Sequence, residues 1–468
     1  MRQLSKEIFR AYDIRGIVGE TLTEESVRAI GCALGTKVLE AGEHSIIVGR
    51  DGRISGVALR DALVEGLVST GCNVVDIGQV PTPVVYFATF ALKIPSGVVI
   101  TGSHNPANYN GLKMMVKGKA LYGDSILGLY DLIQNASFRK GKGAISCKEI
   151  VDSYIQTIKT DIQLPRPLKI VVDCGNGVAG SVVPLLYQAL GCEVIPLFCE
   201  VDGRFPNHHP DPGQPENLVD LKKAVLANNA HLGLAFDGDG DRLGIIDNEG
   251  NIIWPDRLLI LFAKEILAKN PGAPIIFDVK CTRHVNEAIS KFGGTPLMWK
   301  TGHSFIKAKI EETGALLAGE MSGHLFFKDR WFGFDDALYA GARLLELLAK
   351  GSITDSSAEI FARLPNSVNT PEIMLKVSEQ EKFATVQSMI DLAKSEQEKL
   401  TRFEQANIST IDGLRIDYKD GFGLVRPSNT GPNLILRFEG DTDIVLERIK
   451  AEFRTLLQGL QPEWNLPF

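Results

Sequence analysis

The chain has 468 residues, a formal net charge of −7 and 44% hydrophobic residues, a length typical of three or four domains with real cores. No run approaches the roughly 18 apolar residues of a membrane-spanning helix, the first residues lack the apolar centre of a signal peptide, and no basic tract indicates nucleic-acid binding. Seven scattered cysteines, an odd number without zinc-ligand spacing, favour reduced thiols and therefore a cytoplasmic protein.

One pattern of strand, loop, helix, glycine and strand occurs three times along the chain. The copies begin about 105 to 125 residues apart, which is the size of a domain rather than of a solenoid repeat. Strands that alternate with helices predict related α/β domains. The first strands are expected at 44–48, 168–172 and 274–277, the helices at 59–67, 182–190 and 285–292, and the second strands at 71–75, 191–195 and 293–298.

The last hundred residues follow a different pattern. Strands grouped between flanking helices predict a small α+β domain. The helices are expected at 378–400 and 443–457, and the strands at 413–417, 423–425 and 433–437. Polar or proline-bearing stretches separate the domains, which we place at 1–149, 150–252, 253–367 and 368–468.

The first domain contains the stretch Thr101-Gly-Ser-His-Asn-Pro106, directly after the apolar run Gly97-Val-Val-Ile100. This order places Ser103 in a tight loop at the carboxyl end of a buried strand, where open α/β sheets hold ligands. A serine that caps a following helix is an equally ordinary interpretation. Two further stretches, Tyr12-Asp-Ile-Arg15 and Lys113, add cations of a kind that is usually solvated on a surface.

The second domain contains Gly175-Asn-Gly-Val-Ala-Gly180, which follows a predicted strand and matches the glycine pattern of a dinucleotide-binding loop. Glu200 and Asp202 stand at a suitable distance for a ribose contact. The corresponding positions of the other two repeats lack the pattern. A tight turn with an anion-compatible helix start is therefore favoured, and a dinucleotide-dependent oxidoreductase stays open as an alternative.

Three carboxylates follow the apolar run 232–236, in the stretch Asp237-Gly-Asp-Gly-Asp-Arg242. On an extended segment they point to one side, and the glycines let the backbone curl so that their oxygens converge. Such an oxygen cage suits a hard divalent cation. An EF-hand is excluded, because that loop needs glycine where Arg242 stands and glutamate where Asn248 stands. Arg242 suggests that an anion shares the site.

Two later loops carry groups that suit a phosphorylated sugar. Gly319-Glu-Met-Ser-Gly-His324 places a carboxylate and a hydroxyl between glycines, and both bind sugar hydroxyls well, although Ser322 is also a plausible helix cap. Arg426-Pro-Ser-Asn-Thr-Gly-Pro432 offers a guanidinium, two hydroxyls and an amide, a set that suits a phosphate dianion or, alternatively, a surface turn.

A hydrolytic serine is disfavoured. The nucleophile elbow needs glycine where Thr101 and Asn105 stand. His104, next to Ser103, is expected to face away from it on an extended backbone. A serine combined with a carboxylate triplet and cationic loops fits phosphoryl transfer better, since that reaction depends on the positioning of metal and cations.

These motifs, together with Ala11-Tyr-Asp-Ile-Arg-Gly16 and Tyr109-Asn-Gly-Leu-Lys113, occur in the order found in a known family. The chain resembles the α-D-phosphohexomutases, and within them the bacterial phosphomannomutase/phosphoglucomutase group, over nearly its whole length. The resemblance implies four domains around a central cleft, the first three of related α/β topology. It also implies a cytoplasmic enzyme, expected to be a monomer, without membrane or nucleic-acid partners.

The resemblance implies a role for each matching residue. Ser103 is expected to be the phosphoserine, and Asp237, Asp239 and Asp241 to hold one Mg²⁺ together with a phosphoseryl oxygen. Glu320 and Ser322 are expected to contact the O3 and O4 hydroxyls of the sugar. Arg426, Ser428, Asn429 and Thr430 are expected to bind the phosphate that is not transferred. The other matching cleft residues are Tyr12, Arg15, His104, Lys113, Arg242, Lys280, His303 and His324, among which Lys113, His303 and Arg15 are candidates for general acid or base.

Gly102 and Met321 favour the mannose/glucose group, although a phosphoglucosamine mutase stays an alternative. The O2 hydroxyl, where glucose and mannose differ, has no assigned partner, so dual specificity is expected. The implied reaction moves the phosphoryl group of phosphoserine to O6 of a hexose 1-phosphate. The resulting hexose 1,6-bisphosphate, which also serves as activator, turns around and returns its 1-phosphoryl group to Ser103.

Overall fold

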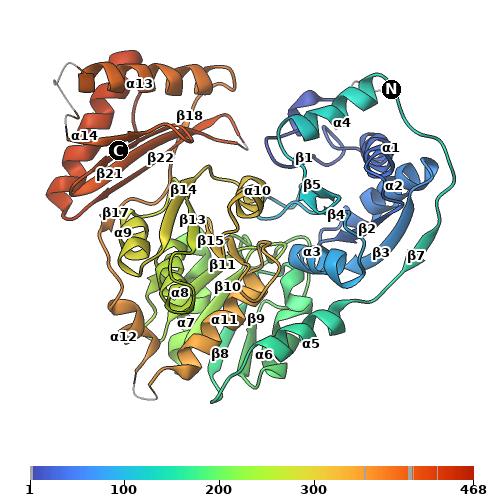
Figure 1. The fold of residues 1–468 in the computed structure, drawn as a ribbon, viewed down its shortest axis with the longest axis horizontal. Coiled ribbons are helices and arrows are strands. Elements are labelled where there is room, and N and C mark those ends of the chain that lie inside the picture. The colour runs from blue at the N-terminus through green and yellow to red at the C-terminus, as the bar shows by residue number, and fades with distance from the viewer. Residues whose placement is uncertain (1–3, 353–354, 399–402, 404, 430) are drawn as a thin grey trace. The chain divides into compact units, whose positions relative to one another are not determined.

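The computed structural model describes residues 4–352, 355–398, 403, 405–429 and 431–468 (Figure 1). Its contacts divide the chain into two compact units, each made of two stretches of sequence. The first unit comprises Met1–Leu258 and His303–Arg363, and the second comprises Leu259–Gly302 and Leu364–Phe468. Among the described helices, none combines the length and the apolar character that crossing a bilayer requires.

A mixed seven-stranded sheet forms the first part of the first unit, in the order β1-β5-β4-β2-β3-β7, with β6 paired to β5. Strand β2 runs parallel to β3 and β4, whereas β5 is antiparallel to β1 and β4. The loops that follow β2 and β4 therefore leave the sheet at one edge. The strands are β1 (Ile14–Ile17), β2 (Ser45–Arg50), β3 (Asn73–Gln79), β4 (Gly97–Ile100), β5 (Tyr109–Val116), β6 (Lys119–Ala120) and β7 (Ile145–Cys147).

Helices cover both faces of this sheet because its strands are apolar on both sides. Ile46 and Val48 of β2 belong to the core that contains α1, α2 and α4, while a Cβ on Gly49 would meet Val85 of α3 on the other face. Helices α1 and α2 cross closely, since a Cβ on Gly66 would lie 2.2 Å from a carbonyl oxygen of α1. The helical segments are η1 (Lys6–Ile8), α1 (Glu24–Glu40), α2 (Gly56–Ser69), α3 (Thr82–Ala91) and α4 (Asp124–Gln134).

The second sheet has the order β12-β11-β10-β8-β9. Strand β10 is parallel to β8 and forms an antiparallel hairpin with β11, so the turn at residues 237–242 stands at the carboxyl end of the parallel strands. Its elements are α5 (Val151–Asp161), β8 (Lys169–Asp173), η2 (Val178–Ser181), α6 (Val183–Ala189), β9 (Glu193–Leu197), η3 (Pro215–Leu218), α7 (Val219–Ala227), β10 (Leu232–Phe236), β11 (Leu243–Asp247) and β12 (Ile252–Ile253).

The third repeat is divided between the units. The first unit contains the antiparallel hairpin of β15 (Leu317–Gly319) and β16 (Leu325–Phe327) with α10 (His303–Thr313), α11 (Ala337–Lys350) and α12 (Ser357–Ala362). The second unit contains the parallel pair β13 (Pro274–Asp278) and β14 (Thr295–Trp299) with α9 (Arg283–Lys291), and α8 (Pro255–Lys269) begins in the first unit and ends in the second.

The C-terminal domain is an antiparallel six-stranded sheet with two long helices. Apolar residues of α13 and α14 form one core with its central strands, and Phe453 of α14 fits against Gly423, where a Cβ would lie 2.3 Å from the ring. The elements are β17 (Val368–Asn369), β18 (Ile373–Lys376), α13 (Glu381–Glu398), β19 (Asn407–Ser409), β20 (Leu414–Tyr418), β21 (Gly421–Pro427), β22 (Asn433–Gly440) and α14 (Asp443–Leu460).

These elements confirm the predicted fold class of three related α/β domains with mixed sheets and a C-terminal α+β domain. Each of the three strand–helix–strand repeats occurs at the expected place, as β2-α2-β3, β8-α6-β9 and β13-α9-β14, and both strands of each repeat are parallel neighbours. The apolar runs and glycine stops were sufficient to place them.

Candidate active site

The loop that carries Ser103 is held by Arg53, a residue that the sequence analysis did not single out. The Arg53 side chain is fully buried. Its guanidinium donates hydrogen bonds to four carbonyl oxygens of the loop, those of Ser103 (2.8 Å), Asn105 (2.5 Å), Pro106 (2.6 Å) and Tyr109 (3.0 Å). Planar guanidinium geometry supports several such bonds at once. Arg53 thus fixes the backbone of the loop from Ser103 to β5.

Asp51 completes this support and explains a glycine. Its carboxylate pairs with Nε of Arg53 (3.2 Å) and accepts a hydrogen bond from the backbone N–H of Gly102 (3.1 Å). A Cβ at Gly102 would lie 2.4 Å from Cζ of Arg53. Gly102 is therefore required by the buried arginine that packs against it.

Ser103 itself is 2% exposed and has a φ of +49°, a left-handed conformation that is uncommon for non-glycine residues. Its Oγ lies 3.0 Å from Oδ2 of Asp237 and 3.1 Å from Nδ1 of His104. The prediction that His104 faces away from Ser103 is wrong, because the left-handed φ breaks the alternation of an extended backbone. The helix-cap interpretation is also wrong, since β5 and not a helix follows the loop.

The carboxylate triplet lies in the turn between β10 and β11, so the expectation of an extended segment is wrong. The backbone curls at Gly240, which has a φ of +76°, and the N–H groups of Asp241 and Arg242 donate to Oδ1 of Asp237 (3.0 and 3.1 Å). The convergence of the oxygens is as expected. All three carboxylates are fully buried, and one oxygen from each lies within 4.8 Å of the others.

Lys113 on β5 is the cation of this cluster. Its Nζ lies 2.7 Å from Oδ2 of Asp239 and also forms an ion pair with Asp241. Thr82 and Thr101 donate their hydroxyls to the same Asp239 oxygen (2.6 and 3.1 Å). Burial opposes the charge of Lys113, but the two carboxylates outweigh it and raise its pKa well above the ordinary value. Lys113 therefore keeps its proton.

The residues present fit a divalent cation. Burial, and then the neighbouring carboxylates of Asp239 and Asp241, raise the pKa of Asp237 well above its ordinary value, so three charges in this space are not balanced by one ammonium group. Within the described part of the chain, Oδ1 of Asp239 and Oδ1 of Asp241 have no hydrogen-bond partner. Buried acceptor oxygens without a donor, in a cage of carboxylates, match the preference of Mg²⁺.

Two histidines stand beside the triplet. His324 accepts a hydrogen bond at Nε2 from Nε of Arg242 (3.1 Å), which places its own proton on Nδ1, 3.2 Å from Asp335 and 3.5 Å from Asp241. The ring of His303, the first residue of α10, lies 5.6 Å from that of His324. Burial, and then Lys307, hold the pKa of His303 well below its ordinary value. The imidazole of His303 is thus neutral.

The hairpin of β15 and β16 packs on the hairpin of β10 and β11, which carries the triplet. The backbone N–H of Leu243 donates to the carbonyl oxygen of Gly323 (3.1 Å), whose φ of +102° requires glycine. Glu320 is buried and Ser322 is half-buried in this turn. The helix-cap interpretation of Ser322 is wrong because β16 follows. The two hairpins thereby bring Glu320, Ser322 and His324 to the edge that carries the triplet.

The N-terminal motif reaches the same loop. Arg15 on β1 is 7% exposed, forms an ion pair with Asp13 and donates to the side chain of Asn105. Tyr12 packs its ring edge-on against His303, with ring centres 5.2 Å apart. Within the first unit, residues 12–15, 51–53 and 237–242 thus hold the loop of Ser103, and His324 and His303 lie beside the triplet.

Family models match the whole of this arrangement. Those described as phosphoglucomutase/phosphomannomutase, alpha/beta/alpha domains I, II and III match residues 6–140, 152–250 and 254–367, and that of the C-terminal domain matches residues 372–456. The chain belongs to the phosphoglucomutase/phosphomannomutase family.

Relatives in the family match along the whole chain. A phosphomannomutase/phosphoglucomutase of Pseudomonas aeruginosa is 54% identical over 99% of this chain and 98% of its own length. A phosphoglucomutase of Neisseria gonorrhoeae is 50% identical over 98% of both chains. A crystal structure of a phosphoglucomutase/phosphomannomutase family protein from Burkholderia thailandensis superposes with a TM-score of 0.93 at 51% identity, covering 100% of both chains.

The remaining expected site residues of this family member lie in the second unit. Arg426, at the end of β21, is buried and paired with Asp412 (2.9 Å), and Nδ2 of Asn429 donates to the carbonyl oxygen of Thr301 (3.2 Å). Lys280 forms an ion pair with Glu372 (2.5 Å). Ser428 is buried, and Thr430 lies outside the described residues.

The loop that contains Ser428 is held by another residue that motif analysis missed. Lys382 on α13 is 2% exposed and donates to the carbonyl oxygens of Ser428 (2.8 Å) and Gly431 (3.1 Å). A buried lysine on a polar helix has no local sequence signal, because only the folded domain places it beneath the loop.

The glycines of 175–180 serve packing in this fold. A Cβ on Gly177 would lie 2.9 Å from the carbonyl oxygen of Gly238, and one on Gly180 would lie 2.1 Å from that of Cys199. The following segments are the short helices η2 and α6. The backbone of the loop is thus pressed against protein where a dinucleotide would have to lie, and the oxidoreductase alternative is not supported.

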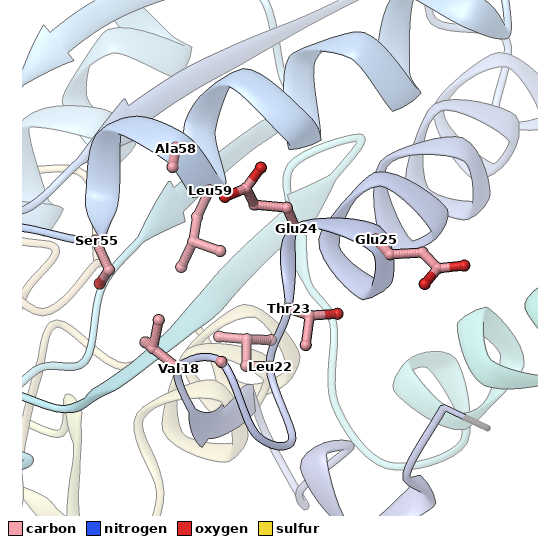
Figure 2. Close-up of a pocket in the computed structure, with 9 residues that line it drawn as sticks. Val18, Leu22, Thr23, Glu24, Glu25, Ser55, Ala58 and Leu59 are labelled. Atoms are coloured by element: carbon pink, nitrogen blue, oxygen red, sulfur yellow. The ribbon is translucent and has the colours of Figure 1, made fainter. Parts of the chain in front are cut away.

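A hollow of about 450 Å³ lies elsewhere, between the starts of α1 and α2 (Figure 2). Val18, Leu22 and Leu59 line it, and Glu24 and Glu25 stand on its α1 side. The carboxylate of Glu24 beside the hollow would repel a phosphorylated ligand, while that of Glu25 is directed away from it (Figure 2). This hollow is therefore poorly suited to a phosphorylated ligand.

Proposed function

We propose that the protein is a phosphohexomutase that interconverts the 1-phosphates and 6-phosphates of glucose and mannose. The observation that carries the proposal is the 3.0 Å contact between Oγ of Ser103 and Asp237, at the edge of a buried carboxylate triplet that already holds a lysine. A hydroxyl beside a metal-binding cage and a fixed cation is arranged for phosphoryl transfer.

In the proposed reaction Ser103 carries the phosphoryl group between turnovers. The O6 hydroxyl of a hexose 1-phosphate attacks the phosphorus, the P–Oγ bond breaks, and hexose 1,6-bisphosphate forms. The bisphosphate turns around and returns its 1-phosphoryl group to Ser103, which leaves hexose 6-phosphate. Lys113 stands beside the triplet as a permanent cation and stabilises the negative charge that develops on the transferred oxygens.

The residues that would hold Mg²⁺ are Asp237, Asp239 and Asp241, with Ser103 as the fourth donor. A bound Mg²⁺ would stabilise the seryl oxygen as the leaving group. Arg242 donates its backbone N–H to the Asp237 carboxylate and its Nε–H to His324. These two hydrogen bonds orient its side chain and hold the turn.

The acceptor of the hydroxyl proton is an imidazole in this proposal. Lys113 is a poor base, because Asp239 and Asp241 hold its proton. His303 is neutral, and within the described residues its Nε2 has no hydrogen-bond partner. His324 is the poorer candidate of the two histidines, because its Nε2 already accepts a hydrogen bond from Arg242. Burial, and then Arg242, also lower the pKa of His104 well below the ordinary value, and its contact with Oγ assigns it to orienting Ser103.

Substrate recognition is assigned to the two remaining loops. Glu320 and Ser322 would bind the O3 and O4 hydroxyls of the sugar. No residue is assigned to the O2 hydroxyl, where glucose and mannose differ, so both sugars would be accepted. Arg426, Ser428, Asn429 and Thr430, with Lys280, would bind the phosphate that is not transferred. Tyr12 and Arg15 would border the sugar beside the serine loop.

The proposal is tested with purified protein, Mg²⁺ and a trace of glucose 1,6-bisphosphate, which should convert glucose 1-phosphate and mannose 1-phosphate to the 6-phosphates. Intact mass should reveal a fraction about 80 Da heavier, the mass of one phosphoryl group. A heavier form that persists in Ser103→Ala would show that another residue carries the group.

The phosphoglucosamine mutase alternative is decided by the same assay. A kcat/KM for glucosamine 1-phosphate above those for glucose and mannose 1-phosphate would overturn the assignment of substrate. We further expect a cytoplasmic monomer, which light scattering of the purified protein and fractionation of cells would check.

A further inference from the structure

Two cysteines meet at the end of the second sheet. Cys174 follows β8 and Cys199 follows β9, and the register of these parallel neighbours pairs Asp173 with Leu197. The pairing continues past the strand, since the N–H of Cys174 donates to the carbonyl oxygen of Leu197 (3.2 Å). The two Sγ atoms lie 3.6 Å apart, and both thiols are reduced. The proposed reaction uses neither sulfur.

We propose that Cys174 and Cys199 form an oxidation site that closes to a disulfide in the presence of an oxidised low-molecular-weight thiol. The register pairs Asp173 with Leu197, so the two cysteines are offset by one position beyond the strand ends, and the separation of their sulfur atoms is the geometry that carries the proposal. The sulfur atoms must approach from 3.6 Å to about 2.05 Å. Side-chain rotation together with a small strand shift provides that movement.

The order of the steps follows from exposure. Cys199 is half-buried, whereas Cys174 is fully buried, and burial raises the pKa of its thiol well above the ordinary value. The thiolate of Cys199 attacks a small disulfide RSSR, and RS⁻ leaves and takes up the proton. Cys174 then loses its proton and attacks Sγ of Cys199, which expels a second RSH. Two electrons and two protons pass in total from the cysteines to RSSR.

The pair is mechanically connected to the carboxylate triplet. Cys174 leads into the loop 175–180, and the N–H of Val178 donates to the carbonyl oxygen of Gly238 (3.1 Å), between Asp237 and Asp239. A Cβ on Gly180 would lie 2.1 Å from the carbonyl oxygen of Cys199. The loop is thus wedged between Cys199 and the triplet. Closure of the disulfide shifts this support and lowers turnover, a consequence that rests on the proposed function.

The chemical step is tested by peptide mapping without reduction. Cleavage after Glu193 and Glu200 releases residues 194–200 with Cys199, while Cys174 stays on the preceding peptide with Cys192. In the Cys192→Ser variant treated with oxidised glutathione, the two peptides should be joined and two hydrogens lighter than their sum. In Cys174→Ser, Cys199 should instead keep one glutathione. Recovery of Cys174 as a free thiol in Cys192→Ser after oxidation would overturn the proposal.

The functional step is tested on the same samples. Oxidised protein should show a several-fold lower kcat that dithiothreitol restores, and Cys174→Ser should lose less under the same treatment. An unchanged kcat in protein that carries the joined peptide would overturn the link to the triplet. Absence of mutase activity in the reduced protein would refute the proposed function instead, and the peptide map would still decide the chemistry.

Discussion

The loop of Ser103 and the loop of Ser428 have the same kind of anchor and different degrees of restraint. Each is held by a buried cation that donates to backbone carbonyl oxygens, Arg53 to four of them and Lys382 to two. Arg53 also forms an ion pair with Asp51, and the Asp51 carboxylate accepts a further hydrogen bond from the backbone N–H of Gly102 in the Ser103 loop. Among the described residues, the anchor of the Ser103 loop thus makes the larger number of contacts with its backbone.

The looser anchor suits the task proposed for the second loop. A phosphate that is bound from either end of a sugar needs donors that adapt, and side chains of Ser428 and Asn429 on a loop held at two carbonyls allow adjustment. Ser103 has a left-handed φ and contacts on both sides, which leaves its Oγ one position.

The largest contrast is expected from one substitution made in both loops. Ser103→Ala removes the atom proposed to carry the phosphoryl group, so kcat should fall by roughly 10³-fold or more. Ser428→Ala removes one of the donors proposed to bind the phosphate, which should raise KM by about tenfold with kcat nearly unchanged. Steady-state kinetics with glucose 1-phosphate measures both. Equal losses of kcat in the two variants would refute the division of roles.

The anchors themselves are compared by Arg53→Met and Lys382→Met. Arg53→Met leaves Asp51 buried without its cation, so the free energy of unfolding should fall by about 3–5 kcal/mol. Lys382→Met leaves two carbonyl oxygens without donors, which should cost about 1–3 kcal/mol. Urea unfolding measures both values. Arg53→Lys keeps the positive charge and should recover part of the lost free energy of unfolding. If nothing is recovered, the stabilisation comes from the planar guanidinium and its several hydrogen bonds and not from the charge.

The close approach at Gly102 provides the third comparison. Gly102→Ala places a methyl group against Arg53 and should lower the free energy of unfolding by about 1–3 kcal/mol. Gly128→Ala, on α4 with open space around the position, should instead stabilise by about 0.5–1 kcal/mol. Thermal unfolding gives both signs. Stabilisation by Gly102→Ala would mean that the arginine can move away from the serine loop.

The smallest effect concerns pH. His303 has a pKa well below its ordinary value in the folded protein, because burial opposes its charge. As pH falls through about 6.5, the unfolded chain binds a proton that the folded protein does not, so folding stability is lost. His303→Gln should make the decrease in unfolding free energy between pH 6.5 and 5.5 smaller by up to about 1 kcal/mol. Identical pH slopes for variant and parent would place a proton on the native imidazole.

Motifs located most of the groups that surround the triplet, because the loop of Ser103, the triplet itself and the turn of Glu320 each stand directly after an apolar strand. Their geometry was less predictable. The left-handed φ of Ser103 turns His104 toward it, and the triplet lies in a hairpin turn rather than on an extended segment. In the first loop the distant Arg53 holds the backbone, whereas the triplet curls through Gly240 and its own hydrogen bonds to Asp237.

The sequence by itself determined the three repeats, the C-terminal domain and the identity of the site motifs, since hydrophobic period and glycine stops act over a few residues. Only the tertiary structure decided what holds the motifs. Arg53, Asp51 and Lys382 carry no local signal, because a charge in a loop or on a polar helix reads as solvated until the fold buries it. The same holds for Cys174 and Cys199, which are 25 residues apart in sequence and 3.6 Å apart at their sulfurs.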